Sequence, residues 1–164
     1  MDKNTLIAAL DFSHARLLDE LGTIEKSGQD MAKVLAWRPG PGRAHMGWQF
    51  AHCAATHERY LKTRLLNETP DEKMVADFAG GSTPSDSNVP SAASLRPLLE
   101  EKYLALRNWV AEQKPETLDR MISVGKNQRS IAETLILMAW HEAHHHGQIH
   151  LTWNLYKAAH QIQN

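Results

Sequence analysis

The chain has 164 residues, of which 42% are hydrophobic and 23% charged, and its formal net charge is −1. This length and composition predict one globular domain over residues 1–164, with a core that needs no disulfide for support. A net charge near zero argues against a nucleic-acid-binding surface, and the lack of a long apolar run argues against a membrane span. The lone cysteine, Cys53, and an N-terminus without a secretory signal pattern favour a cytoplasmic location.

Apolar residues recur at helical spacing in the first segment and predict a helix over about residues 4–26. A short helical turn is expected at 31–37, after which Pro and Gly residues at 38–42 interrupt regular structure. A second helix is predicted over about 45–66. Its inward-facing residues are expected to be Phe50, Cys53, Ala54, Leu61 and Leu65.

Gly, Ser, Pro and Asp are frequent in residues 67–90, so we expect a long surface connection there. A third helix is predicted from Ser91 or Ala92 to Gln113, because Pro115 disfavours a helical conformation in the residue before it.

The turn-rich stretch 118–127 is compatible with a small hairpin. A fourth helix is predicted from Ser130 to about Lys157, because Ser130 and Glu133 have the spacing of a capping box. Four helices without a convincing set of strands predict an all-α fold, an antiparallel four-helix bundle.

Five of the ten histidines fall within a single ten-residue block of the fourth helix. His141 and His145 are four residues apart, so their imidazoles project to one side of the helix and can chelate one ion. A third ligand is needed, and His52 is the best candidate because the small residues around it allow close helix packing. His45 lies about two turns away and His57 is rotated by roughly 140° from His52, so we do not expect them to share the ion.

Two other interpretations use the same residues. Residues 141–145 also fit the H-E-x-x-H motif of zinc proteases. However, Gln148 and Leu151 occupy the positions where the extended motif needs Gly and His. Such a protease also needs a strand edge for its peptide substrate, and none is predicted. Alternatively, the histidines are core residues that bind no ion. The other members of the block are expected at solvent or at an interface: His144, His146 and His150.

Two stretches resemble the DinB-like family of small metal-binding bundles. HEAHHHGQI at 141–149 is similar to its H-x-x-x-H-x-G-Q signature, and GWQFAH at 47–52 matches its first motif, which follows a Pro/Gly-rich turn. The resemblance extends over essentially the whole chain in helix order and loop lengths. It implies an up-down-down-up bundle with a long crossover. The sequence departs from the family pattern at His57, where an acidic residue is usual, and at His146, where Arg is usual.

The resemblance implies that His52, His141 and His145 bind one divalent metal ion, which is nickel, zinc, iron or manganese in family members. Relatives with known chemistry include transferases and isomerases that use a low-molecular-weight thiol, and many members are dimers. We therefore expect a homodimeric metal-dependent enzyme, a thiol-dependent transferase or a hydrolase, with a small-molecule substrate. The alternative is a non-catalytic stress-response protein that binds a metal or small molecule.

Glu142 and Gln148 are the candidate catalytic residues. Three imidazoles leave at least one position on the ion open to water or substrate. Glu142 follows a ligand and could accept a proton, or it could be a supporting or surface carboxylate. Gln148 lies one turn beyond His145 and could orient a ligand or bound water, or only pack within the bundle. Trp48 and Trp140 are candidates for the wall of a substrate pocket.

Overall fold

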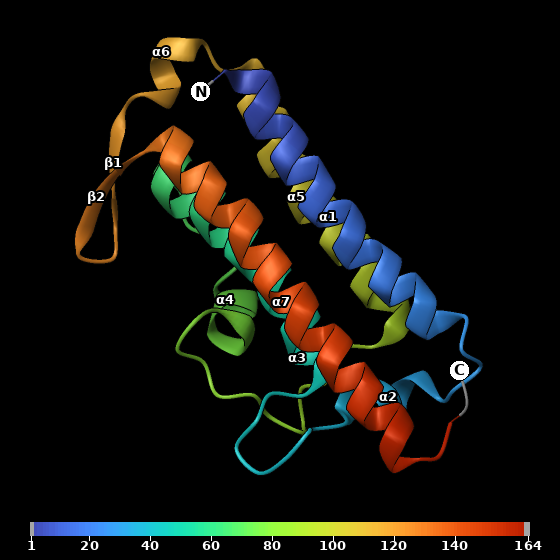
Figure 1. Cartoon of the computed structure of the whole chain (residues 1–164). Helices are drawn as coiled ribbons and strands as arrows, with labels where there is room; N and C mark the ends of the chain where they lie inside the picture. The colour runs from blue at the N-terminus through green and yellow to red at the C-terminus, as the bar shows by residue number, and fades with distance from the viewer. Residues whose placement is uncertain (1, 163–164) are drawn as a thin grey trace.

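The structure is a computed structural model that describes residues 2–162. Four long helices form the bundle (Figure 1): α1 (Lys3–Glu25), α3 (Met46–Arg59), α5 (Ala92–Glu112) and α7 (Ile131–Ala159). The connections contain α2 (Met31–Ala36), the π-helix η1 (Tyr60–Leu66), α4 (Glu72–Phe78), α6 (Pro115–Leu118), β1 (Met121–Val124) and β2 (Asn127–Ser130). The predicted all-α class is confirmed. No helix within the described residues is both long and apolar enough to cross a lipid bilayer.

The bundle has the predicted up-down-down-up order. In Figure 1, α1 and α7 run downward and α3 and α5 run upward. Helix α1 packs against α5 and α7, and α3 packs against the same two helices. Because α3 and α5 are parallel neighbours, residues 67–91 must return along the length of the bundle, and α4 within this crossover packs on α3.

The start of α7 is fixed by the predicted capping box. The Ser130 hydroxyl accepts a hydrogen bond from the Glu133 amide at 3.1 Å, and the Glu133 carboxylate accepts one from the Ser130 amide at 2.7 Å. Two amide groups at the helix start are thereby satisfied. This anchors the helix that carries the histidine block.

The start of α3 depends on a buried histidine. The Nδ1 atom of His45 accepts a hydrogen bond from the Trp48 amide at 2.9 Å, and its Nε2 atom lies 3.2 Å from the Ser85 carbonyl oxygen. Gly47 follows, where an added Cβ would lie only 3.0 Å from Pro90 and 3.3 Å from the Leu35 carbonyl. Only glycine allows the chain to pack this closely at that position.

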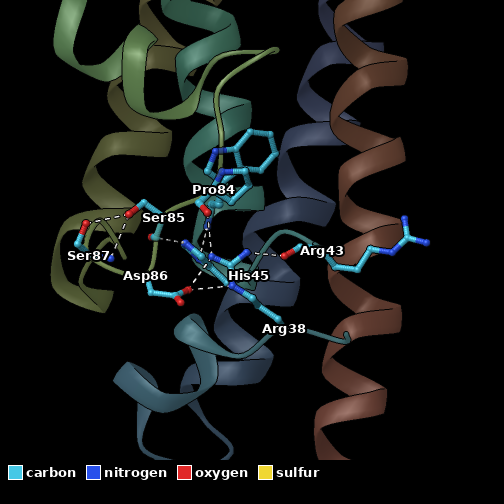
Figure 2. A network of polar contacts seen from close by, with 8 residues as sticks. Arg38, Arg43, His45, Pro84, Ser85, Asp86 and Ser87 are labelled. Carbon is cyan, nitrogen blue, oxygen red and sulfur yellow. Dashed lines mark hydrogen bonds and ion pairs between the residues drawn. The ribbon is translucent and has the colours of Figure 1, made fainter. Parts of the chain in front are cut away.

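Arg38 ties the loop before α3 to the crossover (Figure 2). Its guanidinium donates to the Asp86 carboxylate at 2.6 and 2.9 Å, to the Pro84 carbonyl at 2.9 Å and to the Arg43 carbonyl. One planar, five-donor side chain thus joins two segments, and its contacts with Pro84 and Asp86 span 46 and 48 residues of sequence.

The core runs along the bundle axis as two clusters of buried apolar side chains. The five residues predicted to face inward from the second helix are all buried: Phe50, Cys53, Ala54, Leu61 and Leu65. Three of the small residues on α3 are fully buried, namely Ala51, Ala54 and Ala55. Small side chains let neighbouring helices approach, which brings α3 close to α7.

Three local features differ from the sequence predictions. The crossover, expected as a long surface connection with order only where Met74, Val75 and Phe78 pack down, contains a helix there, α4; Asp71 caps it by accepting from the Met74 amide at 2.9 Å. The second helix continues to Leu66 as predicted, but from Tyr60 onward it has π-helical hydrogen bonding. The hairpin forms by pairing Met121 to Val124 with residues 127–130, slightly beyond the expected stretch.

Candidate metal centre

Three histidines from two helices converge on one point. Their potential ligand atoms, from His52 on α3 and from His141 and His145 on α7, all lie within 4.8 Å of one another. The Nε2 atoms of His52 and His141 are 3.0 Å apart. Two imidazole nitrogens bound to one zinc ion at its usual bond length would be about 3.3 Å apart, so the spacing fits a shared ion. The predicted ligand set is thus brought together.

Hydrogen bonds on the far side of two rings orient them toward this point. His52 Nδ1 lies 2.6 Å from the Phe78 carbonyl oxygen, and His145 Nδ1 lies 2.5 Å from the Gln49 side-chain oxygen. Because these oxygens only accept, both Nδ1 atoms carry the proton and both Nε2 atoms present a lone pair. Such partners fix the ring orientation and raise the basicity of a ligating nitrogen. The Trp48 ring stacks on His52 with centroids 4.5 Å apart.

The site is shielded from water, and this keeps the imidazoles neutral. His52 and His145 are only 6% and 9% exposed. Burial, together with repulsion between the neighbouring histidines, lowers the pKa of both His141 and His145 to about 3. Burial also lowers the pKa of His52. At neutral pH all three lone pairs are therefore available to a metal.

The donor set favours particular metals. Neutral imidazoles suit zinc, iron, nickel and copper better than magnesium or calcium, which prefer oxygen ligands. No fourth His, Cys, Asp or Glu side chain joins the three histidines within residues 2–162. Three protein ligands with an open position are typical of catalytic metal sites, whereas structural zinc sites usually have four.

A cavity of about 230 Å³ borders His52 and His141. Its other lining residues come from α3, η1, the crossover and α7: Thr56, Arg59, Tyr60, Ala79, Gly80, Leu137 and Met138. A second cavity of about 580 Å³ is lined by Gln49 and Gln148, together with residues 39–44 and α7. Space for a small molecule is therefore present beside the imidazoles.

Glu142 points into the core rather than to either of these cavities. Its side chain is fully buried, and its carboxylate oxygen Oε1 lies 3.0 Å from His14 Nδ1 and 3.8 Å from His57 Nε2. It is therefore not a surface carboxylate, and this placement argues against the protease interpretation, in which the glutamate must reach metal-bound water. A catalytic role for Glu142 stays a prediction. Sequence reasoning missed His14 as a member of this buried cluster. Its signal was a histidine within an apolar helical stripe, between Leu10 and Leu17.

Gln148 lies at the edge of the site. Its amide nitrogen is 2.8 Å from His144 Nε2, and its side chain lines the larger cavity. Gln148 also hydrogen-bonds to His145, whose ring is oriented in addition by the Gln49 side-chain oxygen. Sequence reasoning missed Gln49, whose only signal is a position three residues before His52. A catalytic role for Gln148 stays a prediction.

The other aromatic and histidine candidates lie away from the three ligands. Trp140 is 58% exposed and stacks on His144, so Trp48 is the tryptophan at the site. His146 and His150 lie near the Glu20 carboxylate of α1, at 3.7 and 3.2 Å. They link α7 to α1, outside the ligand set as predicted.

Comparison with known proteins supports the resemblance. The family model described as the DinB superfamily matches residues 9–149. The matched span contains all three histidines and at least part of each long helix. The comparison with curated proteins gives no match.

We expect the single substitutions His52→Ala, His141→Ala and His145→Ala each to lower metal stoichiometry sharply, because two imidazoles cannot hold the ion as three do. Gln49→Leu should weaken metal affinity by about 10- to 100-fold, since the ring of His145 loses its partner. Elemental analysis of protein purified without a histidine tag measures the stoichiometry, and competition with a chelating dye measures the affinity.

Two neighbouring histidines serve as controls for this set. His144→Ala and His146→Ala remove imidazoles from the same helix and should leave the stoichiometry unchanged. Full metal occupancy in His141→Ala would show that the ligand assignment is wrong.

The lowered pKa values predict a pH-dependent stability of the metal-free protein. In the unfolded chain these histidines titrate near 6.5, whereas His141 and His145 titrate at about 3 in the folded state. The unfolded state therefore binds more protons between these values, and the free energy of unfolding must fall as the pH drops from 6.5 toward 3. Each histidine contributes a slope of about 1.4 kcal/mol per pH unit within this window.

Urea denaturation of the metal-free protein between pH 8 and pH 5 measures this slope. His141→Ala removes one such histidine and should give a shallower decline than wild type. Identical slopes for the two proteins would mean that His141 is not held neutral by the fold.

Proposed function

Because the chain belongs to the DinB superfamily, we propose that it is a divalent-metal-dependent enzyme acting on a small molecule. It would be a transferase that uses a low-molecular-weight thiol, or a hydrolase. The observation that carries this proposal is the three-histidine ligand set, which is bordered by a cavity and has no fourth protein ligand within the described residues. The cytoplasmic location stays a prediction from the sequence.

A divalent ion in such a site acts as a Lewis acid, lowering the pKa of a bound water or thiol toward neutrality. The protein residues supply orientation and a shaped surface. The Phe78 carbonyl and the Gln49 side chain hold two rings in place. Leu137 and Met138 form an apolar wall of the adjoining cavity, which limits the access of water to one side of a bound substrate.

One observation favours a non-catalytic metal-binding protein as the second candidate. Glu142, the expected proton acceptor, is turned toward His14 in the core. No carboxylate is among the residues that line the smaller cavity. A reaction there would have to pass its proton to solvent or to a group on the substrate.

Metal-loaded protein should catalyse thiol transfer or hydrolysis in a screen of small electrophiles, and the activity should be lost with a chelator and in His141→Ala. Glu142→Gln and Gln148→Ala test the two predicted catalytic residues. His144→Ala is the matched control and should retain activity. A protein that is fully metal-loaded yet inactive throughout the screen would favour the non-catalytic alternative.

The same chelator treatment tests what the ion does for the fold. An ion that binds only the folded state stabilises it by about 2.7 kcal/mol when its free concentration is a hundredfold above its dissociation constant. We expect the melting temperature to fall by several degrees while helical circular dichroism stays nearly intact at room temperature. Complete loss of helix would indicate a structural ion, and an unchanged melting temperature would mean that the histidines bind none.

The chain is also proposed to form a homodimer, as the family resemblance implies. The outer face of α7 carries exposed apolar side chains: Ile136, Trp140, Leu151 and Leu155. Exposed apolar residues clustered on one surface are typical of protein interfaces. Light scattering should give the mass of two chains at micromolar concentration, and Trp140→Ser combined with Leu151→Ser should halve it. A monomeric wild type would contradict the proposal.

A further inference from the structure

Arg59 is a half-buried arginine in the cavity beside the metal centre. Four other arginines on the bundle or its loops pair with carboxylates, namely Arg16, Arg38, Arg96 and Arg107. The Arg59 side chain has no ion pair or hydrogen bond with any residue in the range 2–162. A guanidinium carries five donors in a rigid fork that matches a carboxylate. Its donors are free to bind a ligand in the cavity.

The helical spacing directs Arg59 toward the metal ligands. His52, Thr56 and Arg59 follow one another at intervals of four and three residues, so they share one face of α3. All three line the same cavity. The Cα atoms of His52 and Arg59 are separated by about 10 Å along the helix axis, and long side chains on a helix lean toward its N-terminus. This preference of helical side chains favours a guanidinium that leans toward the imidazoles.

The helix type changes from α to π at this end of the cavity. The π-helix η1 begins at Tyr60, directly after Arg59, and both residues line the cavity. Consecutive residues on a regular α-helix point about 100° apart, so it is less easy for both of them to line the same cavity. Short π-helical segments often occur at functional sites.

The rest of the lining makes the cavity selective for a negative charge. Arg59 is the only formally charged residue among those that line it, while Leu137, Met138 and Ala79 contribute apolar surface. Charge-assisted hydrogen bonds are stronger where water is partly excluded. The Thr56 hydroxyl already donates to the His52 carbonyl at 2.8 Å, so it does not replace the guanidinium as a donor.

Gly80 keeps the other end of the cavity open. A Cβ atom added there would lie 3.9 Å from His52 Cε1. Any longer side chain at this position would extend into the space beside the imidazole. The cavity of about 230 Å³ therefore runs from His52 and His141 at one end to Arg59 at the other.

We propose that Arg59 binds the carboxylate of a small substrate whose other end carries a donor atom, such as a thiol, that reaches the three histidines. The assignment rests on the metal-dependent function proposed above. A cavity of 150 Å³ holds a benzene molecule, so this one admits a short-chain acid rather than a peptide. Specificity comes from two fixed points, the metal position and the guanidinium, with apolar contacts between them.

The test uses the full chain loaded with cobalt(II), whose absorption changes when a thiolate binds. Two probes of similar size differ in charge: 3-mercaptopropionate and the neutral 3-mercapto-1-propanol. Each binds as a thiolate and releases its thiol proton to solvent. Wild-type protein should bind the carboxylate about tenfold more tightly, as expected for hydrogen bonds to a charged group.

Substitutions on α3 and η1 then locate the source of the preference. Arg59→Gln should bind both probes with equal affinity while its cobalt stoichiometry stays that of wild type, and Arg59→Lys should keep part of the preference. Arg64→Gln is the matched control, because Arg64 is a half-buried arginine of η1, which directly continues α3, and it does not line the cavity. It should retain the full preference.

A second variant tests the cavity without touching the charge. Gly80→Val should weaken the binding of both probes at least severalfold with cobalt still bound. Equal affinities in wild type, a preference that persists in Arg59→Gln, or unaffected binding in Gly80→Val would each overturn the assignment. Binding of neither probe to cobalt-loaded protein would do so as well. Failure of wild type to take up cobalt would instead overturn the proposed metal site, and it is measured before any thiol is added.

Discussion

The parallel pairing of α3 with α5 is the constraint on which the rest of the structure depends. Parallel neighbours cannot be joined by a tight turn, so residues 67–91 must travel back along α3, the helix that carries His52. The returning chain therefore passes the metal centre. Its Phe78 carbonyl orients the imidazole, and Ala79 and Gly80 line the cavity beside it. One connection thus closes the bundle and also shapes the site.

Two consecutive residues of helix α7 belong to two different polar clusters. His141 faces the metal centre on α3, while Glu142, rotated by about 100°, enters a buried cluster with His14 of α1. A buried carboxylate is costly unless it is paired, so its contact with His14 opposes rotation of α7 about its axis. The buried contact between Glu142 and His14 on one side of the helix consequently helps to hold the metal ligands in register on the other.

Much of the bundle and two of the three ligands were predictable from the sequence, because each depends on spacing within one helix. The apolar stripes, the pairing of Ser130 with Glu133 and the four-residue interval from His141 to His145 all have this origin. His52 was chosen instead from the small residues around it and from its match to the family's first motif. The partners of the ligands were not predictable in the same way. A main-chain carbonyl such as that of Phe78 has no sequence signature, and the role of Arg59 depends on which segments surround it after folding. Order at Met74, Val75 and Phe78 was expected, but not a helix, because Gly, Ser and Pro dominate the residues around α4.

Because α7 follows the other helices in the chain, the order of synthesis restricts when the metal centre can form. Two of the three ligands and one of the two packing partners of α1 belong to α7. Translating its 29 residues takes roughly 1.5–6 seconds at typical rates of chain elongation. Until then, the nascent chain offers His52 alone and leaves part of the apolar face of α1 uncovered. Capture of the ion can therefore occur only after α7 has been made and has docked, so an incomplete chain cannot trap metal in a half-built site.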